Sequence, residues 1–189
     1  MYTIVMLLKQ LFKRHSLNLL LALVLFILIL ALRLEAHPIS MIWIFAGCIS
    51  GSFLLDLDYY LFAFLVEPSH HFSIRVKEFF HQKNFLGMVA YVGTHTDSLP
   101  RLTLHSALFQ VILAVVVLYV LTSSASLFGQ AFVLSGFLSS IYKMLDQHFK
   151  TKNVDSWFWI LKEKPTKRFI KIYLASLVII FFYSLTFVG

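Results

Sequence analysis

The stretch ISMIWIFAGCISGSFLLDLDYYLFAFLV, residues 39–66, is apolar along most of its length and carries two charged side chains, Asp56 and Asp58. An apolar α-helix needs about 20 residues to cross a bilayer. This stretch therefore predicts a transmembrane helix with two carboxylates toward its C-terminal end. A carboxylate inside a bilayer costs about 2.5 to 3.5 kcal/mol, so each one needs a compensating partner.

The composition agrees with a membrane protein, because 59% of the 189 residues are hydrophobic and only 13% are charged. Too little polar surface remains for a water-soluble globule. We expect an all-α, polytopic membrane protein that forms a single domain over residues 1–189. Its five expected transmembrane helices span about 17–34, 39–66, 102–122, 130–146 and 169–188, and its two long loops span 67–100 and 147–168. Small side chains in 130–146 predict a helix inside the bundle.

The basic residues predict the orientation. Lysine and arginine are frequent before the first expected helix and in both long loops, whereas the connection at 123–129 and the C-terminus carry none. By the positive-inside rule, the N-terminus and both loops are cytoplasmic and the C-terminus is outside. The net charge of +7 then indicates contact with anionic lipid headgroups of the bilayer. We expect no nucleic-acid partner, because the basic residues flank apolar helices and form no single stripe.

The two cytoplasmic loops carry patterns typical of membrane interfaces. Phe72, Val76, Phe79 and Phe80 recur at helical spacing opposite Arg75, Lys77 and Lys83, which predicts an interfacial amphipathic helix. Trp157, Phe158 and Trp159 stand among lysines, and this mixture is typical of anchoring at headgroup level. Binding of a substrate by these aromatic side chains is the alternative.

The two carboxylates cannot share one face of a regular helix. Residues two apart on an α-helix differ by about 200° in direction, so both face one partner only where the helix ends or distorts. Gly51 and Ser52 precede them and make a distortion there plausible. A divalent cation or a paired imidazole would compensate the burial.

The orientation brings further polar side chains to the cytoplasmic depth of Asp56 and Asp58. His105 lies near the start of the third expected helix, and Asp146 lies at the end of the fourth, where a carboxylate opposes the helix dipole. His15 lies at the start of the first, where it could also be part of a basic flank. His37 precedes 39–66, about nineteen residues from Asp56, and is excluded unless that helix is re-entrant.

Imidazole and carboxylate groups together suit zinc, with manganese or iron as alternatives. The set at this depth comprises His15, Asp56, Asp58, His105, Asp146 and, as a further candidate, His148. A divalent ion bound by such groups lowers the pKa of a water molecule and polarises an ester or phosphoester oxygen. The pattern thus predicts metal-assisted hydrolysis.

At these residues the chain resembles the YdjM-like membrane-bound metal-dependent hydrolases, a family of bacterial inner-membrane proteins. Leu55-Asp56-Leu57-Asp58 resembles the family's Pro-Asp-x-Asp motif, and Arg101-Leu-Thr-Leu-His105-Ser106 resembles His-Arg-Gly-x-Thr-His-Ser. Asp146 resembles the Asp of His-x-x-x-Asp, and His15 lies at about the family's distance before the acidic motif. The chain departs from the family at Leu55, Pro100, Leu104 and Tyr142.

The resemblance implies a multi-pass inner-membrane hydrolase that acts on a phosphoester of a lipid or amphiphile. It implies metal ligands at His15, Asp56, Asp58, His105 and Asp146, and catalytic roles for Asp58, Arg101, His105 and Ser106. Pro100 and Tyr142 stand where the family has histidine, and they favour an alternative without enzymatic activity. In that alternative the same groups form a structural polar network or belong to a small transport component.

Overall fold

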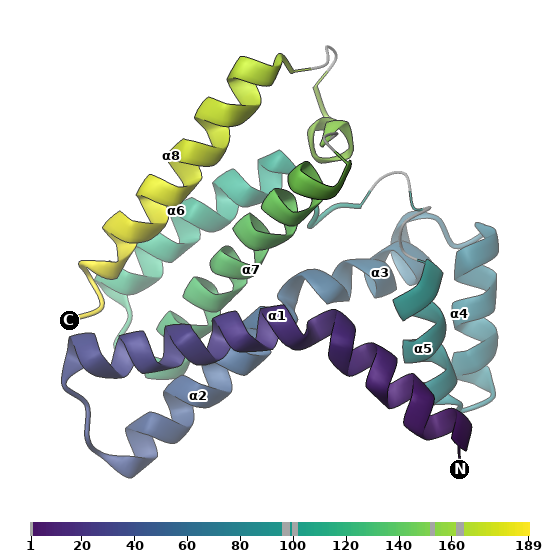
Figure 1. Cartoon of the computed structure of the whole chain (residues 1–189), viewed down its shortest axis with the longest axis horizontal. Coiled ribbons are helices and arrows are strands. Elements are labelled where there is room, and N and C mark those ends of the chain that lie inside the picture. The colour runs from purple at the N-terminus through teal and green to yellow at the C-terminus, as the bar shows by residue number, and fades with distance from the viewer. Residues whose placement is uncertain (1, 96–98, 100–101, 152–153, 162–164) are drawn as a thin grey trace.

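The computed structural model describes residues 2–95, 99, 102–151, 154–161 and 165–189, with side chains from residue 15 onward. Regular structure in these residues is helical (Figure 1). The α-helices are α1 (Tyr2–Arg33), α2 (Pro38–Ser52), α3 (Leu57–Leu61), α4 (His71–His81), α5 (Phe85–His95), α6 (Ala107–Ser123), α7 (Leu127–Thr151) and α8 (Lys167–Leu185). A 3₁₀ turn (Leu54–Asp56) and a π-helical turn (Phe62–Val66) flank α3, and another 3₁₀ turn (Asp155–Phe158) follows α7.

Helix α7 is the centre of the bundle, as its small side chains predict. It packs against α1, α2, α6 and α8. Its contact with α2 is close, because a Cβ on Gly47 or Gly51 would collide with the backbone of α7 at Phe128 or Phe132. The Ser135 hydroxyl also donates to the Cys48 carbonyl at 2.5 Å. These glycines, four residues apart, let two backbones pack as in membrane helix pairs.

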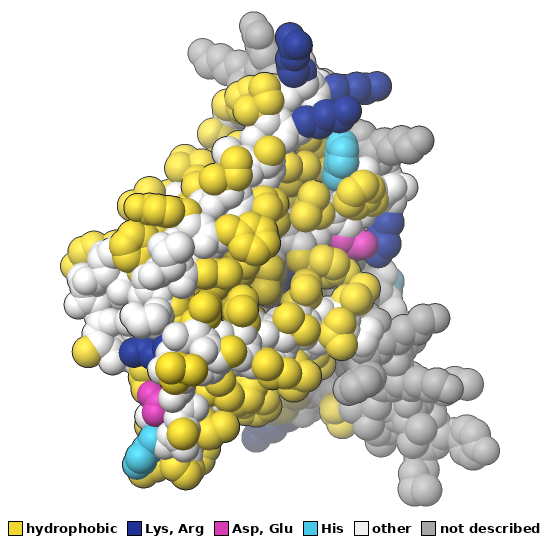
Figure 2. All heavy atoms as spheres, turned by 60° about the vertical axis from the view of Figure 1, so that its left-hand side comes forward, with side chains coloured by type: hydrophobic (Ala, Val, Ile, Leu, Met, Phe, Trp, Pro, Cys, Tyr) yellow, Lys and Arg dark blue, Asp and Glu magenta, His cyan; other side chains and the backbone are white. Residues whose placement is uncertain are grey.

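Three helices of the described residues are long and apolar enough to cross a membrane: His15–Arg33, Pro38–Val66 and Lys167–Leu185. Helix α6 is apolar but shorter, with 17 residues. Figure 2 shows hydrophobic side chains over much of the visible face, while basic side chains lie at its upper end and at a few places along its edges. Many large exposed apolar side chains belong to these helices, among them Ile27, Val115 and Ile179. An exposed apolar surface of this extent is compatible with a membrane protein.

The segment expected at 102–122 begins as a helix only at Ala107, and the one expected at 130–146 extends to Thr151. Residues 102–106 are not helical, because their backbone N–H groups bond to Asp58 instead of to a helix, as described below. Arg33, the last residue of α1, donates to Gln130 at 2.6 Å.

The expected loop at 67–100 contains two helices, α4 and α5, which pack against each other beside α3 (Figure 1). Helix α4 was predicted from its spacing, whereas α5 was not. Phe72 and Val76, expected to face lipid, are buried against Tyr59 and Phe62. The apolar face of α4 therefore packs on protein, and any lipid contact of this hairpin has to use other side chains.

Candidate functional site

A break between α2 and α3 positions the two carboxylates. Helix α2 ends at Ser52, whose hydroxyl donates to the Ile49 carbonyl at 2.7 Å. The chain then makes a 3₁₀ turn from Leu54 to Asp56 before α3 begins. The distortion predicted near Gly51 and Ser52 is thus present, but Asp56 and Asp58 still face different partners.

Asp58 is completely buried and joins α3 to the segment before α6. Its Oδ1 accepts from the Thr103 backbone N–H at 3.0 Å, and its Oδ2 accepts from those of Leu104 and His105 at 2.7 and 2.9 Å. Hydrogen bonds to a charged acceptor are about twice as strong as neutral ones. This carboxylate therefore fixes residues 103–105 and compensates its own burial.

The imidazole of His105 is the fourth group that donates to Asp58. Its Nδ1 lies 3.0 Å from Oδ2 of Asp58, so Nδ1 carries the proton that is donated to the carboxylate. Its Nε2 is buried and makes no hydrogen bond within the described residues. Burial lowers the pKa of His105 below its ordinary value, while the hydrogen bond to Asp58 opposes that shift. Burial therefore favours the neutral imidazole, in which Nε2 is the nitrogen that carries the lone pair.

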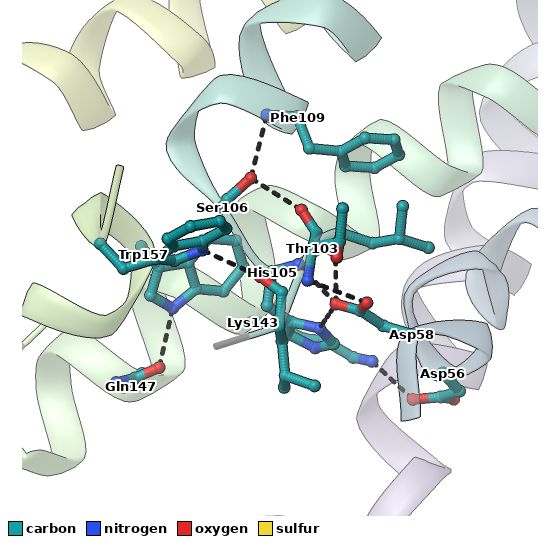
Figure 3. A network of polar contacts seen from close by, with 12 residues as sticks. Asp56, Asp58, Thr103, His105, Ser106, Phe109, Lys143, Gln147 and Trp157 are labelled. Atoms are coloured by element: carbon teal, nitrogen blue, oxygen red, sulfur yellow. Dashed lines mark hydrogen bonds and ion pairs between the residues drawn. The ribbon is translucent and has the colours of Figure 1, made fainter. Parts of the chain in front are cut away.

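Asp56 lies in a second, more open group that α1 and α7 complete. The Lys143 ammonium lies 2.6 Å from Oδ1, and Nδ1 of His15 lies 3.5 Å from Oδ2. Each of these three side chains is about one-fifth exposed. Oδ2 itself accepts no hydrogen bond from the described part of the chain. Figure 3 shows Lys143 reaching from α7 toward Asp56, beside the pair formed by Asp58 and His105.

The remaining predicted residues lie in other surroundings. The Ser106 hydroxyl caps α6 by accepting from the Phe109 N–H at 3.2 Å, and it donates to the Thr103 carbonyl at 2.7 Å. Asp146 pairs with Lys150 at 2.7 Å on one face of α7, and its side chain is one-third exposed. Arg101 lies outside the described residues. His37 begins α2, at the end of the bundle away from α3 (Figure 1).

Two residues of this region, Lys143 and Trp157, had not been placed at the site from the sequence. Lys143 interrupts an apolar run three residues before Asp146, and a lysine inside a predicted span is a signal that could have marked it. Trp157 was expected at the headgroups, but it is 1% exposed and its ring packs on His105 at a centroid distance of 5.5 Å. Its indole N–H donates to Gln147 at 2.7 Å. Phe158 is buried as well, so the anchoring expected of Trp157 and Phe158 is wrong.

The donor set can be tested for a metal ion. No three His, Cys, Asp or Glu side chains of the described residues form a ready metal-binding group. However, His105 Nε2 and Asp56 Oδ2 are buried atoms that make no hydrogen bond to the described residues, and Nδ1 of His15 lies 3.5 Å from the second. An imidazole whose other nitrogen donates to a carboxylate is the usual form of a histidine ligand to zinc. These donor types suit a divalent cation, although no three of them form a metal-binding group in the described part of the chain.

No family model, curated protein or solved structure matches this chain.

Proposed function

We propose that this protein is a membrane-embedded, metal-dependent hydrolase that acts on a phosphoester of a lipid or amphiphile at the cytoplasmic face. The observation that carries the proposal is the state of His105. Its Nδ1 is held by a buried carboxylate, and its Nε2 is buried without a hydrogen bond in the described chain. A neutral, oriented imidazole of this kind is suited to bind a metal or accept a proton.

In this proposal His15, Asp56 and His105 hold the ion, and Asp58 orients His105. Asp58 already accepts from three backbone N–H groups and the imidazole, which suits it to a supporting role. The ion would supply Lewis acidity and lower the pKa of a water molecule. Lys143, now beside Asp56, would offer a positive charge to a phosphoryl oxygen. Trp157 shields His105 and keeps its surroundings apolar.

The proposed membrane topology has five crossings, made by α1 from His15, by α2 through Val66, and by α6, α7 and α8. In the described part of the chain, three of these five segments are long and apolar enough to cross a membrane. Helix α7 is the least apolar of the five, but four neighbours cover it, so its serines and Lys143 are shielded from lipid. The positive-inside rule then places the site and the α4–α5 hairpin in the cytoplasmic half.

The first experiment measures the metal content of detergent-purified protein by elemental mass spectrometry, after equilibration with zinc, manganese or iron and removal of free ion. We expect the wild type to retain metal, and H105A and D56A to lose it. H95A is the matched control, because His95 is exposed at the end of α5. A wild type without metal, together with a D56A variant of unchanged stability, would refute the proposal.

A second experiment measures hydrolysis of a chromogenic phosphodiester and of a phospholipid in mixed micelles. Activity that a chelator abolishes, that zinc restores and that H105A lacks is the expected result. Activity that a chelator and H105A both leave unchanged would show that it arises elsewhere.

A structural polar network without enzymatic activity is the second candidate, and one observation favours it. Lys143 neutralises Asp56 at 2.6 Å, so that both buried carboxylates have partners from the protein itself. This candidate predicts that D56A destabilises the fold while the wild type retains no metal. The metal measurement therefore separates the two candidates.

A further inference from the structure

An apolar edge runs from the π-helical turn Phe62–Val66 to the hairpin of α4 and α5, and the described side chains of the bundle do not cover it. We call the exposed side chains Phe64, Leu65, Phe80, Phe85 and Leu86 the hairpin edge. Their exposed fractions lie between 40% and 73%. Aromatic contacts link them, because the rings of Phe64 and Phe80 lie 5.6 Å apart and those of Phe80 and Phe85 lie 6.1 Å apart.

The turn that forms this edge has a defined geometry. Lys83 has a φ of 55°, a left-handed conformation that costs a non-glycine residue about 1 kcal/mol or more. The next residue, Asn84, starts α5 by accepting from the Gly87 N–H at 2.9 Å. The turn thus brings Phe80 and Phe85 together at the tip of the hairpin, although each one exposes about half of its surface to the surroundings.

The position and charge of the edge indicate what covers it. Phe64 and Leu65 belong to the candidate span Pro38–Val66, so the edge continues a surface that already faces lipid. Arg75 and Lys83 are exposed on the same hairpin, and basic side chains beside apolar ones are attracted to anionic headgroups. The inner face of the hairpin is already occupied by its own core, which includes Phe72, Val76 and Met88.

We propose that the hairpin edge is inserted into the anionic cytoplasmic leaflet, with Phe80, Phe85 and Leu86 among the acyl chains and Arg75 and Lys83 at the headgroups. Of the face of α4 that the sequence pattern indicated, Phe80 lies in this edge, whereas Phe72 and Val76 lie in the core of the hairpin. Asp58 precedes Phe64 by six residues, or about 9 Å of helix. The edge therefore keeps lipid headgroups within reach of the site. This inference does not depend on the proposed hydrolase activity.

Cysteine labelling tests the insertion, because Cys48 is the single cysteine and is completely buried. In a C48A background, the variants F85C and L86C are labelled with an environment-sensitive nitrobenzoxadiazole dye. The full-length protein is then placed in nanodiscs that hold one copy each and contain anionic lipid. E78C is the polar control on the same hairpin, and I179C, on an outward face of α8, is the reference for lipid contact.

We expect the labels at 85 and 86 to emit at shorter wavelength than the label at 78. Lipid-borne nitroxides should quench them as they quench the label at 179. Labels at 85 and 86 that behave like the one at 78 would overturn the proposal. Labels that are shielded from aqueous quencher but not reached by lipid nitroxides would also overturn it, because protein would then cover the edge. Replacing Arg75 and Lys83 by glutamine should shift the labels toward the aqueous values.

Discussion

Asp56 and Asp58 stand two residues apart, yet their surroundings differ in kind. Asp58 is completely buried and accepts from three backbone N–H groups and one imidazole. Asp56 is one-fifth exposed and faces two flexible cationic or ionisable side chains, Lys143 and His15. Backbone donors are fixed by the fold, whereas a lysine or a histidine can move aside. The comparison teaches that Asp58 holds the structure and that Asp56 is the carboxylate free to exchange partners.

The largest expected effect comes from Asp58→Asn. The asparagine lacks the negative charge to which three backbone N–H groups donate, and its own NH₂ group would point at those donors. We therefore expect the free energy of unfolding to fall by about 4 kcal/mol. The measurement is thermal unfolding in detergent, followed by tryptophan fluorescence, since Trp157 lies beside His105. If D58N melts at the wild-type temperature, the comparison between the two carboxylates is broken.

Much of this fold followed from the sequence, because the relevant signals are local. Gly51 and Ser52 indicated the helix break, and the small residues of 130–146 indicated a helix inside the bundle. Charge bias predicted that His105 lies at the depth of Asp58, and their contact bears this out. These predictions needed only helix geometry and the cost of burying charge.

The pairing of side chains could not be predicted, because it depends on a few degrees of helix rotation. The 3₁₀ turn at Leu54–Asp56 decides that Asp56 faces α1 and α7 while Asp58 faces residues 103–105. The burial of Trp157 was equally hidden, since a tryptophan among lysines has the same local pattern at a headgroup and in a core. Helix α5 was missed because its short apolar run lay in a segment interpreted as a loop.

A double-mutant cycle between Lys143 and Asp56 sharpens the comparison. Lys143→Met leaves the partly buried Asp56 carboxylate without the ammonium group that pairs with it. We therefore expect the free energy of unfolding to fall by about 1 to 2 kcal/mol, a value between those for exposed and for buried ion pairs. Asp56→Asn removes the charge as well, and the double variant should recover about 1 kcal/mol relative to the sum of the single variants. The same unfolding measurement applies. Strict additivity would mean that the 2.6 Å contact contributes nothing to stability.

Lys143→Met should also strengthen metal binding, if Asp56 exchanges partners as proposed. The lysine and a divalent cation would both neutralise the Asp56 carboxylate and would repel each other. Removal of the lysine should therefore raise the affinity for the cation about tenfold. Competition with a zinc-sensitive dye measures that affinity for the wild type and for K143M. Weaker zinc binding by K143M would show that Lys143 supports the ion instead of competing with it.

The smallest effect is expected for Asp146→Asn, and it is the most direct test of the ligand set that the sequence suggested. Asp146 is one-third exposed and pairs with Lys150 one helical turn away, and exposed pairs of this spacing contribute about 0.3 to 0.5 kcal/mol. We therefore expect D146N to keep the wild-type melting temperature to within that amount and to keep its metal content. Loss of metal in D146N, at unchanged stability, would place Asp146 in the site with Asp56. The end of α7 would then have to move toward α3, and the division between a fixed and an exchangeable carboxylate would extend to a third aspartate.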